Sequence, residues 1–222
     1  MIPVITIDGP SGAGKGTISQ RVAEALGWHM LDSGSLYRLL ALAATLDALD
    51  FSDEEALAEL AGRLDVVFEP TPEGLKILLR STDVSSAIRV EAIGMKASKI
   101  AALPAVRAAL LGRQRDFAVA PGLVADGRDM GTTVFPVAKL KIFMTASAEA
   151  RAERRYKQLM NKGFSASLPA LVADLKARDE QDSQRRVSPL VPAADAILLD
   201  TTTMSIDDVT NQVLTQAKQI FG

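Results

Sequence analysis

A glycine-rich segment near the start of the chain has the residue types and spacing of a phosphate-binding loop. It follows an apolar run at residues 4–7, precedes a helical pattern, and consists of Gly9, Pro10, Ser11, Gly12, Ala13, Gly14, Lys15, Gly16 and Thr17. Glycines let successive backbone N–H groups turn toward one anion, the following helix adds the positive end of its dipole, and the lysine ammonium reaches the outer phosphates. We therefore expect this loop to bind a polyphosphate, with ATP as the first choice.

The loop departs at one position from the commonest form of this pattern. The spacing G-x-x-x-x-G-K is met, but Gly16 follows Lys15 and the hydroxyl comes one place later, at Thr17. This G-K-G-T variant resembles the loop of nucleoside monophosphate kinases. The alternative is a glycine-rich turn without chemistry, which a strand before it and a helix after it disfavour.

A second polar cluster, Asp32-Ser33-Gly34 followed by Tyr37 and Arg38, lies where a predicted strand gives way to a helix. Ligands of parallel α/β sheets bind outside the carboxyl ends of the strands. Ser33 and Arg38 are therefore candidates for holding a second phosphate. The alternative is an ordinary helix cap with a solvated arginine.

A third cluster, Asp126-Gly127-Arg128-Asp129, directly follows the predicted strand at residues 123–125. A carboxylate at a strand end beside a phosphate loop can order the waters around Mg²⁺, which suits Asp126. The guanidinium of Arg128 offers a forked donor for a phosphate. The alternative for this segment is a polar tight turn.

The order of the predicted elements is that of an α/β protein with a parallel sheet flanked by helices. Strands are predicted at residues 4–8, 28–31, 123–125, 140–144 and 196–199. Helices are predicted at residues 15–26, from the caps Asp32 and Ser33 through Leu46, at 53–64 after the cap Ser52, and at 90–102, 104–117, 148–161, 168–182 and 205–221. Two extended runs around a turn-rich link predict a small antiparallel insertion at residues 65–88.

Composition limits the class of protein. The chain has 222 residues, of which 48% are hydrophobic, enough for one large core. With 25 basic and 27 acidic residues the formal charge is -2, so we expect no nucleic-acid partner. The sequence has no cysteine, and its longest aliphatic run, residues 39–46, is too short to span a bilayer. We expect a monomeric cytoplasmic protein without a membrane partner.

Four segments together resemble the bacterial cytidylate kinases. They are residues 5–17, residues 31–38, residues 125–131 and residues 189–195, and the resemblance covers nearly the whole chain. It implies a single P-loop NTPase domain over residues 1–222, with a monophosphate-binding region at about 33–107 and a short lid at about 151–167. It also implies that the chain phosphorylates CMP and dCMP from ATP with Mg²⁺.

The resemblance assigns roles to individual residues. Cytosine contacts fall on Ser98, Arg107 and Asp129, with the carboxylate facing the amino group and the other two facing the acceptors. Uracil would place an oxygen against the carboxylate, which favours cytosine. The full set implied for CMP is Ser33, Tyr37, Arg38, Ser98, Arg107, Arg128, Asp129, Arg178, Asp182 and Arg185.

Several of these positions have a plainer interpretation without the resemblance. Ser98 and Arg107 could be surface positions on helices, and Arg178 with Asp182 could be a solvated i,i+4 ion pair. The basic helix that contains Arg154 could be a charged face. By resemblance it belongs to the lid, where Arg154 would approach the donor phosphates.

The predicted chemistry is in-line phosphoryl transfer. Lys15, Arg128 and Arg154 would neutralise the moving group, with Mg²⁺ near Asp126 and Thr17. Two rivals stay open: a kinase for another small acceptor, such as UMP or shikimate, and a regulatory nucleotide switch. A switch usually reads guanine through Asn-Lys-x-Asp, but Asn161-Lys162 is followed by Gly163 and Phe164.

Overall fold

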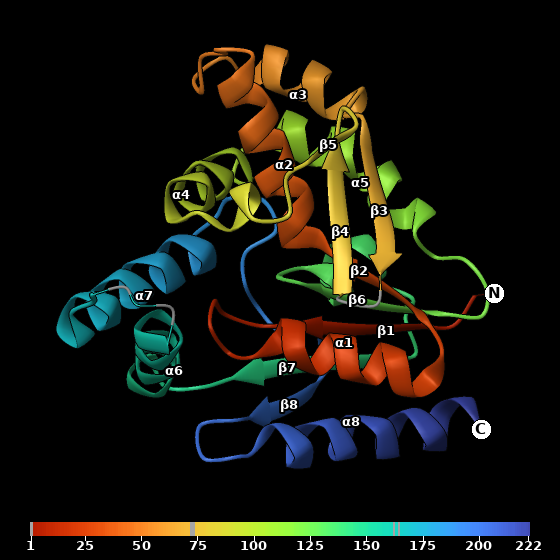
Figure 1. The fold of residues 1–222 in the computed structure, drawn as a ribbon. Coiled ribbons are helices and arrows are strands. Elements are labelled where there is room, and N and C mark those ends of the chain that lie inside the picture. Colours follow the sequence, from red (N-terminus) through yellow and green to blue (C-terminus); the bar gives the residue numbers. More distant parts are fainter. Residues whose placement is uncertain (1, 72–73, 162, 164) are drawn as a thin grey trace. The chain divides into compact units, whose positions relative to one another are not determined.

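The computed structural model describes residues 2–71, 74–161, 163 and 165–222 (Figure 1). By its internal contacts the chain divides into two compact units. The first consists of Met1–Leu31 and Arg115–Gly222, and the second of Asp32–Gln114. Residues 72, 73, 162 and 164, which fall within the predicted insertion and lid, lie outside the described residues.

The first unit is built on a five-stranded sheet with the order β2-β6-β1-β7-β8. The central strand β1 pairs in parallel with β6 and β7, and β7 pairs in parallel with β8. The strands are β1 (Val4–Asp8), β2 (His29–Asp32), β6 (Leu123–Gly127), β7 (Leu140–Thr145) and β8 (Ile197–Asp200). All five residues of β1 are buried, as expected for the centre of a parallel sheet covered by helices.

Helices α1 (Lys15–Leu26) and α8 (Ile206–Phe221) pack beside each other and against this sheet (Figure 1). Their apolar residues recur at helical spacing and meet those of β1, β6 and β7 in one cluster. Its most buried members include Ile5, Ile7, Val22, Val124 and Val213. This core fixes the carboxyl end of β1 relative to the start of α1.

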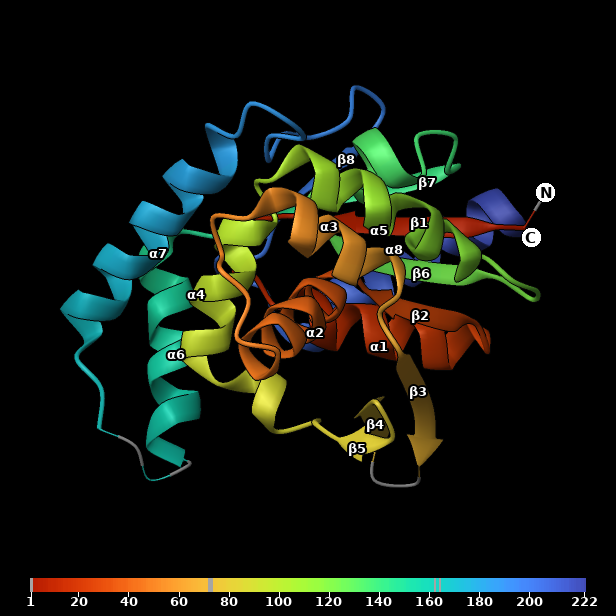
Figure 2. The same cartoon turned by 90° about the horizontal axis from the view of Figure 1, so that it is seen from above.

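Two further helices of the first unit, α6 (Ala148–Asn161) and α7 (Leu168–Ser183), lie side by side in both views (Figures 1 and 2). Helix α6 follows β7 directly. A single turn of π-helix, η2 (Met130–Val134), follows β6. The carboxyl ends of β1, β6 and β7 therefore lead into the loop before α1, into η2 and into α6.

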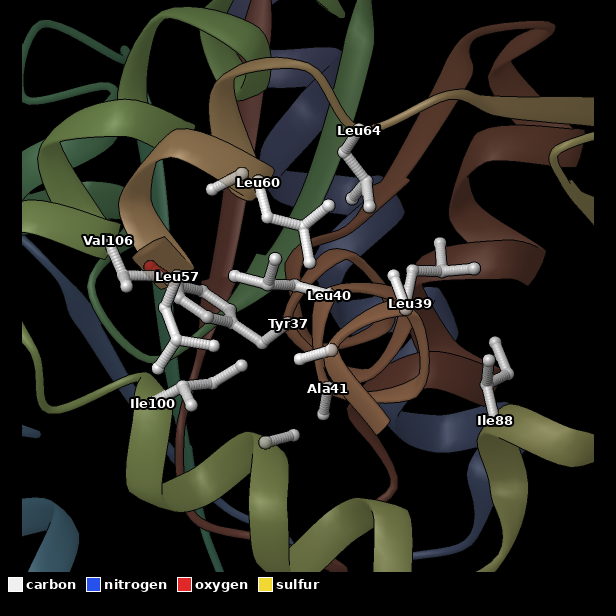
Figure 3. Close-up of a cluster of buried hydrophobic side chains, with 14 of the residues drawn as sticks. Tyr37, Leu39, Leu40, Ala41, Leu57, Leu60, Leu64, Ile88, Ile100 and Val106 are labelled. Carbon is white, nitrogen blue, oxygen red and sulfur yellow. The ribbon is translucent and has the colours of Figure 1, made fainter. Parts of the chain in front are cut away.

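The second unit has its own core around α2 (Ser33–Leu46). Figure 3 shows Leu40 of α2 on the side of Leu57 and Leu60, and Leu39 on the side of Ile88. The other elements are α3 (Glu54–Gly62), β3 (Val66–Thr71), β4 (Gly74–Leu79), β5 (Thr82–Asp83), η1 (Ala87–Arg89), α4 (Glu91–Ile100) and α5 (Pro104–Asp116). Strands β3, β4 and β5 form a separate antiparallel sheet.

The predicted fold class is confirmed: a parallel sheet flanked by helices, with an antiparallel insertion inside residues 65–88. Two details of the prediction were wrong. Helix α3 begins after Asp53, whose carboxylate accepts a hydrogen bond from the Ala56 N–H at 3.0 Å, and not after Ser52. Strand β6 continues through Asp126 and Gly127, which pair with Ile7 and Asp8, so these two residues do not form a tight turn.

The division into one domain with sub-regions at 33–107 and 151–167 stays a prediction. No helix within the described parts of the chain is both long enough and apolar enough to cross a bilayer.

Candidate active site

The glycine-rich loop runs from the end of β1 to the start of α1 in a conformation that requires glycine at two positions. Gly9 has φ of 148°, and a Cβ on it would lie 2.2 Å from the carbonyl oxygen of Met144 in β7. Gly14, the N-cap of α1, has φ of 92°. Both angles lie in the region that side chains other than hydrogen disfavour. The loop backbone is therefore held against β7 and turns into the helix without a side chain in the way.

The N-terminus of α1, the positive end of its helix dipole, is not capped by a side chain. The structure describes this helix in full. Its N-cap residue, Gly14, has no side chain that could cap the helix, and the first turn contains no acidic residue. The first N–H groups of a helix need partners from outside it, and they favour an anion. This arrangement suits a phosphate group.

The ammonium of Lys15 lies over the loop. It is buried, donates to the Pro10 carbonyl oxygen at 3.1 Å and lies 3.8 Å from Oδ1 of Asp126. The other carboxylate oxygen of Asp126 would lie 3.6 Å from a Cβ on Gly16. The carboxylate of β6 thus lies against the first turn of α1, within ordinary van der Waals contact of a Cβ at position 16.

This corner of the site suits a Mg²⁺ ion carried by nucleotide phosphates. Among the described residues, no group of three or more His, Cys, Asp or Glu side chains could hold a metal ion alone. Mg²⁺ in nucleotide sites keeps several waters and uses one or two protein ligands with the phosphates. The buried carboxylate of Asp126 and the exposed Thr17 in the first turn of α1 meet that requirement.

Asp182 of α7 brings two predicted arginines together. Its carboxylate, 1% exposed, accepts a 2.9 Å bond from Nε of Arg128 through one oxygen and a bond from Nη2 of Arg185 through the other. A solvated surface pair is therefore the wrong interpretation for Asp182. Because one carboxylate faces two guanidinium groups, the cluster keeps one unit of positive charge, which suits an anionic ligand. Arg178, one turn earlier on α7, is half-buried.

Ser98 and Arg107 of the second unit are also buried, which corrects their interpretation as surface positions. The guanidinium of Arg107 lies 5.9 Å from the ring centroid of Tyr37 and donates to the Ala101 carbonyl oxygen at 3.0 Å. Ser98 is 8% exposed, and its Oγ has no hydrogen-bond partner among the described residues. A buried hydroxyl without a partner is costly, so it indicates a ligand atom at this position.

Arg38 and Ser33 lie on α2 in the same unit. Nη1 of Arg38 donates to the Ile88 carbonyl oxygen at 2.8 Å. Nη2 of Arg38 would lie 2.8 Å from a Cβ on Gly94, so a larger residue at this position of α4 would require the guanidinium to shift. Ser33 is the buried first residue of the helix, whose N-cap is Asp32 as predicted: its carboxylate accepts from the Ser35 N–H at 3.1 Å.

Arg151 is a residue that the sequence did not single out. Its buried guanidinium donates to the Ser11 carbonyl oxygen in the loop at 2.9 Å, to the Ala146 carbonyl oxygen at 2.9 Å, and to both oxygens of Asp179. Arg154, the residue expected near the donor phosphates, instead donates to the carbonyl oxygens of Thr201 and Thr202. Both arginines belong to one basic helix, and helical periodicity gives no reason to prefer Arg151.

Asp8 at the end of β1 is a second residue missed. Its side chain is buried and accepts from the Met130 and Gly131 N–H groups, each at 2.8 Å. Burial is the main reason that the pKa of this carboxyl is raised to about 6. Its only sequence signal was its position directly before the loop.

The glycine loop between a buried parallel strand and a helix, with its lysine and the carboxylate at the next strand end, defines a P-loop nucleotide-binding protein. A family model described as cytidylate kinase matches residues 5–219. The chain belongs to the cytidylate kinase family.

Curated relatives agree along their full length. A protein named cytidylate kinase from Aeromonas hydrophila subsp. hydrophila is 57% identical over 222 residues, covering 100% of this chain and 96% of the relative. The cytidylate kinase of Pectobacterium carotovorum subsp. carotovorum is 56% identical, covering 100% of this chain and 99% of the relative. That of Proteus mirabilis is 54% identical over 220 residues.

Proposed function

We propose that the chain transfers the γ-phosphoryl group of ATP to CMP or dCMP, giving ADP and CDP or dCDP. The observation that carries this proposal is the cytidylate kinase match over residues 5–219, which includes the loop and every residue assigned to the acceptor. ATP is the donor because the loop and the helix start suit a polyphosphate.

The reaction needs no general base. The attacking atom is a phosphate oxygen of CMP, which is already anionic near neutral pH. It forms a bond to the γ-phosphorus of ATP, the bond from that phosphorus to the bridging oxygen breaks, and ADP leaves with the electron pair. Catalysis then depends on holding two anions in line and neutralising the moving group.

On the donor side we assign this work to the loop at residues 9–17 and to Lys15. The ammonium of Lys15, near Asp126 and the Pro10 carbonyl, is placed to move onto the outer phosphates. Asp126 and Thr17 would hold Mg²⁺ through its waters, and the ion would offset charge on the phosphates. Arg154 stays a candidate for the lid arginine that contacts the transferred group.

On the acceptor side we assign the cytosine contacts to three side chains. The carboxylate of Asp129 would accept from the cytosine amino group, and Ser98 and Arg107 would donate to the ring acceptors. The partnerless Oγ of Ser98 among the described residues supports this assignment. Uracil of UMP would place a carbonyl oxygen against the carboxylate of Asp129. Two acceptors would then face each other without a donor, which would disfavour UMP binding.

We assign the sugar and phosphate of CMP to the remaining residues. Arg128, Asp182 and Arg185 form the buried cluster described above, and Arg178 lies beside it on α7. Ser33, Tyr37 and Arg38 on α2 would hold the acceptor phosphate. The monomeric state and the cytoplasmic location stay predictions.

A coupled ADP-release assay with CMP, dCMP, UMP and AMP tests the proposal. We expect rapid turnover with CMP and dCMP, slow turnover with UMP, and little without an acceptor. Chelation of Mg²⁺ by excess EDTA should stop the reaction, and added Mg²⁺ should restore it. Equal rates with CMP and AMP would reject the cytosine assignment, and no acceptor-dependent turnover would favour a regulatory switch.

A further inference from the structure

Asp8 joins two segments that are far apart in the sequence. It is the last residue of β1, is 5% exposed, and lies immediately before the phosphate-binding loop. Its Oδ1 accepts from the Met130 N–H and its Oδ2 from the Gly131 N–H, both at 2.8 Å. Two charge-assisted hydrogen bonds to one buried carboxylate fix the position of the backbone at Met130 and Gly131.

The segment that Asp8 holds begins at the residue assigned to the cytosine amino group. Asp129 is the N-cap of the π-helical turn η2, and within the described residues its side chain makes no cap bond to that turn. An N-cap aspartate ordinarily accepts from the N–H groups that follow it. Here the N–H groups of Met130 and Gly131 donate instead to the carboxylate of Asp8 in β1.

The turn is also held tightly against β1. A Cβ on Gly131 would lie 2.9 Å from Oγ1 of Thr6 and 3.4 Å from Oδ2 of Asp8. No larger residue fits there without moving the turn. The direction of the Asp129 side chain therefore depends on the contact between Asp8 and the Met130–Gly131 peptide.

We propose that Asp8 is a positioning residue for substrate selection, whose ionised carboxylate fixes the turn after Asp129 and so sustains the preference for cytosine over uracil. This inference rests on the proposed function. Asp8 acts through Asp129 and touches neither substrate.

The charge of Asp8 changes in an accessible pH range. The pKa of its carboxyl is raised to about 6: burial is the main cause and the neighbouring Asp129 acts in the same direction, whereas the two N–H bonds and Lys15 of α1 act against them. The aliphatic stem of Lys141 from β7 approaches the same turn at Gly131. A protonated carboxyl would place an O–H against an N–H donor and lose one of the two bonds. Selectivity should therefore fall as the pH drops below about 6.

The test is the ratio of kcat/KM for CMP to kcat/KM for UMP, measured from about pH 5.5 to pH 8. Both acceptors carry a phosphate that titrates near pH 6, so that effect cancels in the ratio. For the unmodified chain we expect the ratio to fall severalfold toward low pH. For Asp8→Asn we expect the ratio to be roughly tenfold lower at pH 7.5, because about one hydrogen bond is lost. The ratio of this variant should not change with pH.

Asp207→Asn is the matched control. Asp207 is an exposed carboxylate of the same unit that pairs with Arg21, outside the site, so its removal should leave the ratio and its pH profile unchanged. A damaged loop would lower both rates together and leave the ratio intact, which separates positioning of Asp129 from general loss of structure.

Three results would overturn the proposal: an unchanged ratio in Asp8→Asn, a ratio of that variant that still varies with pH, or a constant ratio in the unmodified chain. The last measurement decides the matter even if Asp8→Asn does not fold. Failure of the proposed function would look different, because the unmodified chain would then show no turnover with CMP.

Discussion

The loop at residues 9–17, which we assign to the donor phosphates, would present mainly backbone groups to its ligand, whereas the residues assigned to the acceptor would present side chains. In the loop, only Lys15 contributes a charged side chain, and the glycines serve to let the backbone approach. The acceptor residues Ser98, Arg107 and Asp129 are each buried and polar. Removing one side chain should therefore change acceptor choice, while donor binding should resist all but a few substitutions.

The strongest test of this contrast is Lys15→Ala. Because the ammonium stabilises charge on the transferred group for any acceptor, kcat should fall by about 1,000-fold or more with CMP and UMP alike. The coupled assay measures this fall. Lys218→Ala, at an exposed position near the end of α8, is the control and should keep the activity of the unmodified chain. A loss confined to CMP would contradict the assignment of Lys15 to the donor side.

Asp129→Ala tests the acceptor side. Loss of the carboxylate that we assign to the cytosine amino group should lower the CMP to UMP ratio of kcat/KM by about 100-fold, with the KM for ATP nearly unchanged. The exposed Asp116 provides a control, since Asp116→Ala should keep the ratio of the unmodified chain. Full preference for CMP in the Asp129 variant would show that the cytosine assignment is wrong.

Asp8 gives a prediction about stability rather than rate. Its folded pKa of about 6 lies above the value of 3.8 for an exposed aspartate. The folded state therefore binds the proton more tightly, and the free energy of unfolding should fall as the pH rises from about 4 to about 6. The loss should be on the order of 3 kcal/mol, since the two pKa values differ by about two and each pKa unit corresponds to roughly 1.4 kcal/mol.

Urea unfolding of the unmodified chain and of Asp8→Asn at several pH values isolates this contribution. The difference in unfolding free energy between the two proteins should change across that pH window and stay constant above it. A difference that is independent of pH would mean that the carboxyl titrates at its ordinary value when folded.

The smallest expected effect concerns Arg151, a side chain that touches the loop through a carbonyl. Lysine cannot reproduce the bonds to Ser11, Ala146 and Asp179 together, so Arg151→Lys should raise the KM for ATP about fivefold. Arg21→Lys, an exposed exchange on α1, is the control. An unchanged KM for ATP would show that the loop keeps its shape without this anchor.

The sequence predicted what depends on local patterns. The spacing of glycines and lysine gave the loop, and alternating strands and helices gave the parallel sheet. The choice between Ser52 and Asp53 as the cap of α3 failed because both residues cap helices well. The burial of Ser98 and Arg107 could not be predicted either, because it depends on how α4 and α5 pack and not on the periodicity of these helices.

Contacts between distant segments could not be predicted at all. Asp8 and Met130 are 122 positions apart, and Arg151 and Ser11 are 140 positions apart. In each contact one partner is a backbone group, whose availability depends on the surrounding fold and leaves no signal in residue type. The sequence therefore suggested candidates for ligand contacts, but not the residues that hold the backbone around those candidates in place.

The insertion of the second unit between the two parts of the first has a consequence for synthesis of the chain. Strand β1 leaves the ribosome before its partners β6 and β7, which follow only after the whole of Asp32–Gln114. At roughly 5–20 residues per second, this strand, which is buried along its whole length in the folded chain, waits on the order of ten seconds for a neighbour. The middle segment, which has its own core, can collapse first, while β1 is still without the strands that cover its edges.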